Sequence, residues 1–267
     1  MSSNVAAGGN LLLGHGEVYF DRLSAAGAKT GEVFMGNVSA LAITMSNEVK
    51  EKYDSVTAAG NLLARVITRT TAEVSLSMTE FTAKNLALYA LGDASSPYTQ
   101  SSATVVAESL NGGVAIPSTD AWYPLANRGS IALPITAVTV KVSASTKVLG
   151  TDYLLDLVGG RVYIIATGSI VAGTSVVTVD YTAPALTTTA ALDRVLAGTR
   201  ADVTGLMRFV GVPTSGPKWE AVLWKVTFTP DGELALIADD FGEFKLKGAV
   251  LSDGVHTDLY QLIKRGN

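Results

Sequence analysis

Polar and apolar residues alternate along residues 65–79, so that the even and odd positions form two different faces. The even positions are mostly apolar and include Val66, Val74, Leu76 and Met78. The odd positions are polar and mostly small, and they include Thr71, Glu73, Ser75, Ser77 and Thr79. Because successive side chains of a strand point to opposite faces, this pattern predicts a long β-strand with one buried and one solvated face.

Residues 39–48 repeat this pattern. The apolar positions are Leu41, Ile43 and Met45, and the opposite positions are Ala40, Ala42, Thr44, Ser46 and Glu48. Two long strands that share a smooth polar face indicate a sheet that lines a space rather than a catalytic pocket. Ordinary solvent exposure is the alternative, because antiparallel sheets often have one wet side.

The segment Val49–Leu63 separates the two long strands. It carries four charged residues in its first half, namely Lys50, Glu51, Lys52 and Asp54. This segment is too polar and too long for a tight hairpin, so we expect a projecting loop that contacts a neighbouring subunit. A loop that is merely solvated is the alternative.

A short helix is expected directly after the second long strand. Thr82 is a favourable N-cap residue, and Gly92 stands where a glycine often ends a helix. The apolar side of this helix consists of Leu86, Leu88, Tyr89 and Leu91. We therefore expect the helix to pack on the buried face of the sheet.

The composition changes between residues 95 and 185, where charged residues become sparse. Short strand-like runs follow one another, and Gly159-Gly160 predicts a two-residue hairpin turn between two of them. We therefore expect a core domain made of residues 1–94 and 186–267, with residues 95–185 as an inserted small β-domain. In the return path, Ala191–Ala197 is a possible short helix.

Alternation resumes near the C-terminus, where Glu220–Thr229, Glu233–Ala238 and Glu243–Leu251 predict an antiparallel meander. The turns between these strands contain Pro230-Asp231-Gly232 and Asp239-Asp240-Phe241-Gly242. We expect Trp224 and Phe228 to lie in the core. The meander has the same parity pattern as the two long strands, so these strands are expected to join one sheet system.

The composition restricts the classes of function. Apolar residues make up 48% of the 267-residue chain and charged residues only 16%, which favours a sizeable core. A net charge of −4 argues against a protein that binds the outside of nucleic acid. The absence of cysteine excludes disulfides, thiolate zinc sites and cysteine nucleophiles. Neither a signal peptide nor a membrane span is expected.

The sequence offers little that resembles an active site. His15 and His256 are the only histidines, and no carboxylate or serine arrangement accompanies either one. Asp239-Asp240 is explained by a turn and strand cap, with a metal site as the less favoured alternative. We therefore predict no enzyme activity, no cofactor and no metal.

The order of elements resembles the tail tube (major tail) proteins of long, flexible-tailed bacteriophages of the siphophage type. The likeness covers about residues 10–95 and 190–260 and lies in pattern more than in identity. The residues that carry it are Gly16–Asp21, Glu73–Phe81, Asn85–Gly92, Trp219–Phe228, Pro230–Leu234 and Ile237–Phe241. Residues 95–185 depart from the minimal pattern, although decorating domains are common in such proteins.

This resemblance implies a mainly β fold, an antiparallel β-sandwich or barrel of the tail tube type with one short flanking helix. It also implies a structural virion protein whose copies form hexameric rings that stack into a hollow tube. Double-stranded DNA would pass through the lumen without specific binding. The tape measure protein and the tail terminator and tip proteins are the further partners. Assembly would take place in the cytoplasm of the host bacterium, with the protein ending in the phage tail of the virion.

The polar strand face suits such a lumen, because a wall rich in Lys or Arg would bind phosphates and hold the DNA. The residues expected to line the lumen are Thr44, Ser46, Glu48, Glu73, Ser75, Ser77 and Thr79. Arg65 and Arg69 share this parity. We expect them near the loop end, paired with acids of an adjacent subunit. The alternative function is a surface adhesin or carbohydrate-binding module in which residues 95–185 form the binding domain.

Overall fold

The computed structural model describes residue 12 and residues 14–24, 26–56, 60–92, 97–187 and 192–266. Contacts divide the chain into two units, the first made of Met1–Ser95 and Val195–Asn267 and the second of Ser96–Arg194. The second unit extends further than residues 95–185, because Leu186 and Leu192 form isolated bridges with Gln100 and Tyr98. Most of the expected N-terminal arm, residues 1–16, lies outside the described residues.

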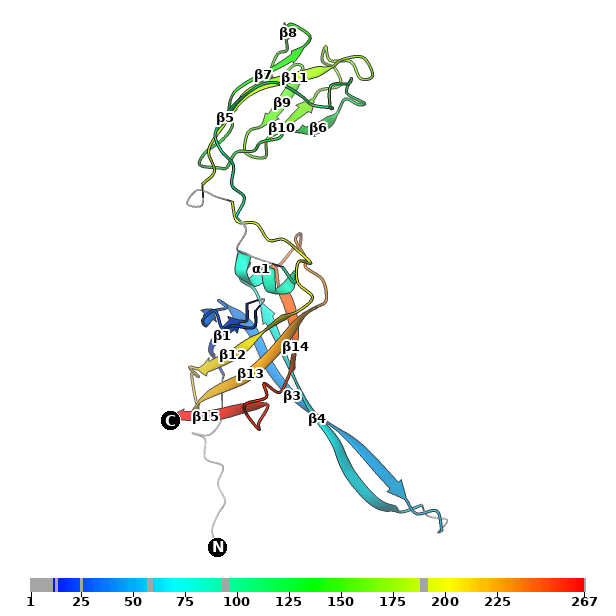
Figure 1. The fold of residues 1–267 in the computed structure, drawn as a ribbon, viewed down its shortest axis with the longest axis vertical. Coiled ribbons are helices and arrows are strands. Elements are labelled where there is room, and N and C mark those ends of the chain that lie inside the picture. Colours follow the sequence, from blue (N-terminus) through cyan, green and yellow to red (C-terminus); the bar gives the residue numbers. More distant parts are fainter. Residues whose placement is uncertain are drawn as a thin grey trace. The chain divides into compact units, whose positions relative to one another are not determined.

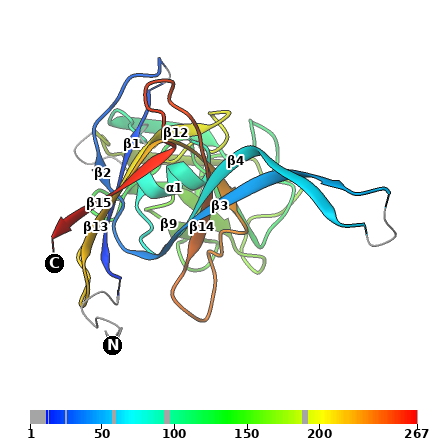
Figure 2. The same ribbon diagram turned by 90° about the horizontal axis from the view of Figure 1, so that it is seen from below.

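The first unit contains one antiparallel sheet of eight strands, in the order β2-β1-β12-β13-β14-β4-β3, with β15 paired to β13 (Figures 1 and 2). Within the described residues this sheet is open rather than closed into a barrel. The chain is mainly β, as expected. Because the sheet is open, the barrel alternative is wrong for a single copy. The strands are β1 (Gly16–Arg22), β2 (Val33–Phe34), β3 (Val38–Tyr53), β4 (Leu62–Met78), β12 (Val203–Gly211), β13 (Lys218–Asp231), β14 (Phe244–Val250) and β15 (Tyr260–Gly266).

The core of the first unit lies on one face of this sheet. Alternate residues of β4 from Ala72 to Met78 are buried, as the sequence pattern predicted, and Leu41 and Ile43 of β3 pack against them. Phe228 is fully buried in the same cluster, which confirms its predicted place. The opposite face of β3 and β4 is exposed or partly exposed along its length.

Trp224 is not a core residue, which corrects the sequence prediction. The pairing of β12 with β13 shifts register between Gly205 and Met207, so the alternation of β13 changes phase there. Leu223 and Val226 consequently belong to the core cluster. Trp224 is partly exposed.

The helix α1 (Ala83–Tyr89) begins as predicted, because the Thr82 hydroxyl accepts a hydrogen bond from the backbone N–H of Asn85 at 3.2 Å. Its end differs from the prediction. Leu91, with φ of 47°, takes the left-handed position, and the N–H of Gly92 donates to the Ala87 carbonyl. This is the Schellman arrangement with leucine at C′. A Cβ at Gly92 would lie 2.1 Å from the Leu196 carbonyl oxygen, so close packing requires this glycine.

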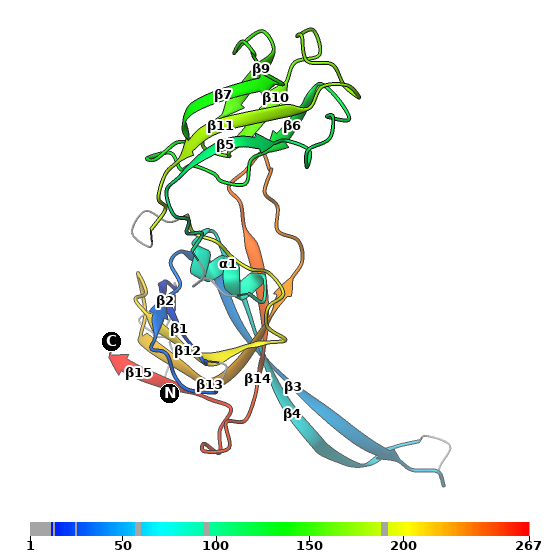
Figure 3. The same ribbon diagram turned by 45° about the horizontal axis from the view of Figure 1, so that its top comes forward.

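The second unit contains two antiparallel sheets, β6-β10-β9 and β5-β11-β7-β8 (Figure 3). Their buried residues form one shared core. This part therefore has a sandwich-like architecture. Its strands are β5 (Ala103–Ser109), β6 (Ala121–Pro124), β7 (Thr136–Val142), β8 (Ser145–Thr146), β9 (Tyr153–Asp156), β10 (Arg161–Ile164) and β11 (Val177–Ala183).

Two predictions about this region are wrong in detail. The hairpin at Gly159-Gly160 exists, but Asp156 pairs with Arg161, so four residues form the turn instead of two. Asp156 stabilises this longer turn by accepting from the N–H of Gly159 at 2.7 Å. The possible helix at Ala191–Ala197 is absent from its described residues 192–197, where Leu192 bridges Tyr98.

Candidate functional site

The exposed face of the sheet in the first unit brings together small polar residues from four neighbouring strands. Cross-strand pairing aligns Thr44, Glu73, Ala249 and Thr227 in one row, and two parallel rows lie beside it. We call this surface the polar face. It comprises Ala40, Ala42, Thr44, Ser46 and Glu48 of β3, Arg69, Thr71, Glu73, Ser75 and Ser77 of β4, Lys245, Lys247 and Ala249 of β14, and Thr227, Thr229 and Asp231 of β13.

Six of the seven residues predicted to line a lumen share this polar face, namely Thr44, Ser46, Glu48, Glu73, Ser75 and Ser77. Thr79 does not, because β4 ends at Met78. Its hydroxyl accepts from the Asn37 side chain at 2.7 Å, so Thr79 fastens the chain before β3 to the end of β4. The pairing of β3 with β4 thus places all the predicted lumen residues on one face except Thr79.

The sequence analysis missed two basic residues on the polar face. Lys245 and Lys247 of β14 lie opposite Ser77 and Ser75. Neither lysine was assigned to this face, because sequence alternation does not reveal which strands are neighbours. The alternating residues of Phe244–Val250 gave a signal for their orientation, but not for their partner strand.

The charges of the polar face compensate one another. The Lys247 ammonium lies 3.0 Å from the Glu73 carboxylate, and the hydrogen bond between them raises the pKa of Lys247. The polar face contains three acidic and three basic residues, so its formal charge is zero. The acids are Glu48, Glu73 and Asp231, and the bases are Arg69, Lys245 and Lys247.

The predicted projecting loop is mostly strand. Lys50, Glu51 and Lys52 belong to β3, and β3 and β4 continue as a two-stranded ribbon that extends beyond the rest of the first unit (Figures 1 and 2). Asp54 lies just past β3, where its N–H donates to the Asn61 carbonyl. Residues 57–59 of the predicted loop lie outside the described residues.

This segment did not read as strand because both faces of the ribbon are exposed or partly exposed, so its residues show no polar–apolar alternation. Two register shifts also occur in the ribbon. They fall between Glu48 and Val49 and between Lys52 and Tyr53, and each adds one residue to β4. After the first shift Val49 pairs with Ile67, so the parity of β4 is inverted. Val66, assigned to the buried face by parity, is 60% exposed.

The arginines of the ribbon pair within the chain. Arg65 lies opposite Glu51 with its Nε 3.6 Å from the carboxylate, and Arg69 lies opposite Glu48 at 3.8 Å. Both arginines thus have an acid of their own chain within reach, and pairing with acids of an adjacent subunit stays a prediction. Cross-strand opposite charges favour this register, although such exposed pairs contribute little stability.

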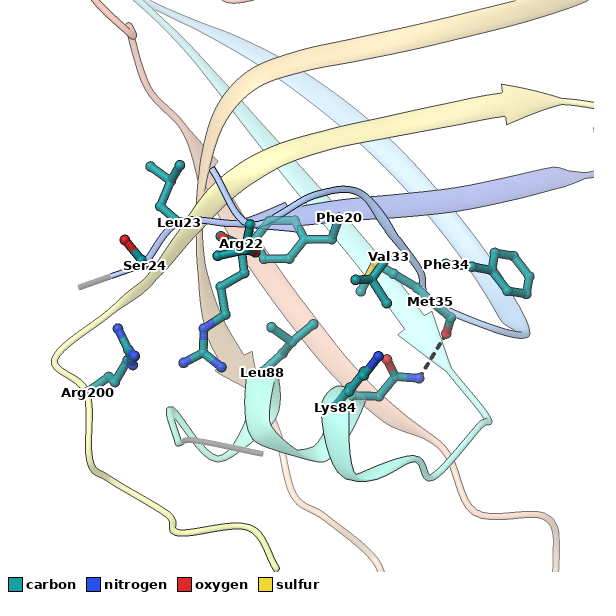
Figure 4. Close-up of a pocket in the computed structure, with 12 residues that line it drawn as sticks. Phe20, Arg22, Leu23, Ser24, Val33, Phe34, Met35, Lys84, Leu88 and Arg200 are labelled. Carbon is teal, nitrogen blue, oxygen red and sulfur yellow. Dashed lines mark hydrogen bonds between the residues drawn. The ribbon is translucent and has the colours of Figure 1, made fainter. Parts of the chain in front are cut away.

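A pocket lies between β1, β2, the start of α1 and the chain that precedes β12 (Figure 4). We call it the basic pocket, because its described lining contains three bases and no acid. The bases are Arg22, Lys84 and Arg200, and the apolar lining consists of Phe20, Leu23, Val33, Phe34, Met35 and Leu88. The buried Asn85 side chain secures its wall by donating to the Met35 carbonyl at 2.9 Å.

His256 packs against Trp224 on the surface of the first unit. The two rings are stacked with centroids 3.7 Å apart, and Nδ1 of His256 lies 2.7 Å from the Asp253 carboxylate. Hydrogen bonds from His256 lower the pKa of Asp253, foremost the bond from its backbone N–H. The Trp224 indole also donates to Asp258 at 3.0 Å, so the loop between β14 and β15 is fastened to β13.

His15 and Asp240, two further candidates from the sequence, lie in exposed segments. His15 is exposed before β1, and the Asp240 carboxylate accepts from the Phe241 N–H as a turn residue would. Within the described ranges, no group of three or more His, Cys, Asp or Glu side chains is placed to hold a metal ion.

The sequence was compared with known families and proteins. The sequence model of a family described as protein of unknown function UCP028589 matches residues 11–259. The chain belongs to this family. A search of curated proteins found no match.

The range matched by family UCP028589 contains the polar face, the ribbon, the basic pocket and the whole second unit. The second unit is therefore part of what the family model describes.

No helix in the described parts of this family member is long and apolar enough to cross a membrane.

Proposed function

We propose that this chain is the structural subunit of a phage tail tube of the siphophage type. Its copies would form hexameric rings, and the rings would stack into a hollow tube through which DNA passes during ejection. One observation carries the proposal: the register of β3, β4, β14 and β13 gathers small polar side chains with compensated charges on one long exposed face.

The chemistry of the polar face fits a wall past which DNA slides. Every lysine or arginine bound to phosphate releases counterions and adds affinity, so an excess of bases would hold the polymer. The three bases of the polar face stand against three acids, and Lys247 is engaged by Glu73. Between these charges lie Ser, Thr and Ala side chains, which are short and offer no strong phosphate contact.

The open sheet supports assembly. β3 forms one end of the sheet, and its outer edge has no strand partner among the described residues. A long exposed edge presents unpaired N–H and C=O groups and is prone to pair with another chain. Joining several copies edge to edge would cover these groups and close a barrel that one copy leaves open.

The remaining partners follow from the same proposal. The tape measure protein would occupy the lumen before ejection, and the tail terminator and tip proteins would cap the two ends of the tube. The subunits would assemble in the cytoplasm of the host bacterium and remain in the virion. The second unit would then decorate the tube.

Electron microscopy of the purified protein tests the proposal directly. Uniform rings or hollow tubes with sixfold end views are expected at high protein concentration. A preparation that stays monomeric in micrographs and in sedimentation at all concentrations would contradict it.

The alternative function, a carbohydrate-binding module, is favoured by one cluster in the second unit. Trp122 is 43% exposed and contacts Tyr163, with ring centroids 5.2 Å apart, while the Arg161 guanidinium lies 5.0 Å from the Trp122 ring centre. Exposed Trp, Tyr and Arg side chains are typical of binding surfaces. Glycan binding by the full chain that is lost in Trp122→Ala would support this alternative.

A further inference from the structure

The segment between β13 and β14 exposes large apolar side chains to an unusual degree. Ile237 is 97% exposed, Phe241 is 94% exposed and Leu236 is also exposed. We call residues 232–243 the acidic loop, because their charged residues are all acids, namely Glu233, Asp239, Asp240 and Glu243. Exposed apolar groups of this kind mark contact surfaces.

The acidic loop is held at both ends while its middle is exposed. At its start the Tyr89 hydroxyl donates to the Gly232 carbonyl at 2.7 Å. At its end Gly242 packs so closely on the Phe81 ring that a Cβ there would lie 2.8 Å from it. Fixed ends limit the conformations of the loop, so less entropy is lost when its middle is ordered by a partner.

The basic pocket complements the acidic loop in polarity and in charge. Its apolar lining offers contacts for Ile237 and Phe241, and Figure 4 shows Arg22, Lys84 and Arg200 around this lining. Acids on the loop and bases at the pocket attract one another and orient the two surfaces before contact.

We propose that the acidic loop of one copy docks into the basic pocket of a second copy. This inference rests on the proposed self-assembling function and names the surfaces that join neighbouring copies. No residue of the acidic loop lines the pocket in the same copy. Donor and acceptor surfaces differ, so the contact is head-to-tail and repeats from copy to copy. Such contacts close into rings when the rotation between copies allows it.

Disulfide cross-linking tests the contact, because the chain has no cysteine of its own. An Ile237→Cys variant is mixed with a Val33→Cys variant and oxidised under mild conditions. The position of Val33 in the pocket lining and its 40% exposure make it accessible to the loop. A cross-linked dimer containing one copy of each variant is expected.

The matched control pairs Val33→Cys with Val255→Cys, a variant at an exposed apolar position outside the acidic loop. This mixture is expected to give no cross-linked product above the level of each variant alone. Circular dichroism of every variant checks that the fold is intact. A product of equal yield from the control mixture would overturn the proposal, because cross-linking would then reflect random collision.

Charge exchange supplies a second, independent measurement. Lys84→Glu in the Val33→Cys copy is expected to lower the cross-linking rate by about tenfold, since an attraction becomes a repulsion. Asp239→Lys in the Ile237→Cys copy should restore most of that rate. Loss without recovery, or no loss at all, would contradict the predicted contact.

The outcomes separate this proposal from the proposed function. Wild-type tubes in micrographs without the specific cross-link would refute the docking contact and leave the tail tube proposal standing. A specific cross-link from a protein that forms no rings or tubes would refute the tube and retain the contact. In a double-cysteine variant, a cross-link formed within one copy, independent of dilution, would also overturn the docking between copies.

Discussion

Reversing one charge on the polar face should change DNA passage without unfolding the subunit. The perturbation is Glu73→Lys. Glu73 and Lys247 are each about half exposed, with side-chain exposures of 52% and 51%. An exposed pair of this kind contributes little to the stability of a domain. The fold should therefore survive the change.

The effect on DNA is much larger. The charge of the polar face changes from zero to +2 in each copy, which adds about twelve positive charges to a ring of six copies. When a protein makes about six to ten phosphate contacts, raising the salt from about 50 mM to 200 mM lowers its affinity for DNA by about 10³–10⁵-fold. Glu73→Lys should thus retard ejection strongly at low salt, and higher salt should relieve the defect.

The assay is DNA release from purified virions that carry the variant, together with the ratio of plaques to particles. Glu73→Gln removes one negative charge and Ser77→Arg adds one positive charge, so each raises the net charge of the polar face by one and should give an intermediate defect. The exchange Glu73→Lys with Lys247→Glu restores a neutral face and should restore release. Normal plaque counts for Glu73→Lys at low salt would refute the assignment of this face to a lumen.

Three further predictions concern assembly and stability. Replacing residues 54–61 by a short turn should leave folded subunits that no longer form tubes, as sedimentation would show. Thr82→Ala removes the N-cap of α1 and should lower the free energy of unfolding by about 1 kcal/mol in urea titrations, whereas Thr82→Ser should not. Asp156→Asn should lower the melting temperature of the second unit at pH 7, because hydrogen bonds from Gly159 and Arg161 lower the pKa of Asp156. That stabilisation is present above the ordinary pKa and is lost as the pH falls through the folded pKa, so calorimetry should show the difference between variant and wild type shrinking as the pH is lowered below the ordinary pKa of Asp156.

Alternation predicted the faces of the long strands well where the sheet is regular. From Ala72 to Met78 every second residue of β4 is buried, and β14 pairs with this stretch without a register shift. The start of α1 was also predictable, because Thr82 acts through its own side chain on the backbone of the next turn. Local physics determines both features.

The errors occur where pairing between distant strands decides the outcome. Trp224 was placed in the core because the sequence of β13 alternates without interruption, whereas its pairing with β12 shifts register between Leu223 and Val226. Lys245 and Lys247 were not assigned to the polar face because β14 and β4 are far apart in the sequence and become neighbours only in the folded sheet. The strand character of Lys50–Lys52 was hidden because all three residues are exposed, so no buried alternate position marks the strand.

The ribbon formed by the outer parts of β3 and β4 is hard to explain in an isolated copy. Both of its faces are exposed there, yet Leu63, Val66 and Ile67 are apolar and each is more than half exposed. A two-stranded hairpin alone is marginally stable in water. Its exposed ion pairs, such as Arg65 with Glu51, add little. We infer that a neighbouring copy supplies the contacts that this ribbon lacks, which is why shortening its tip should prevent assembly while leaving the core of the subunit folded.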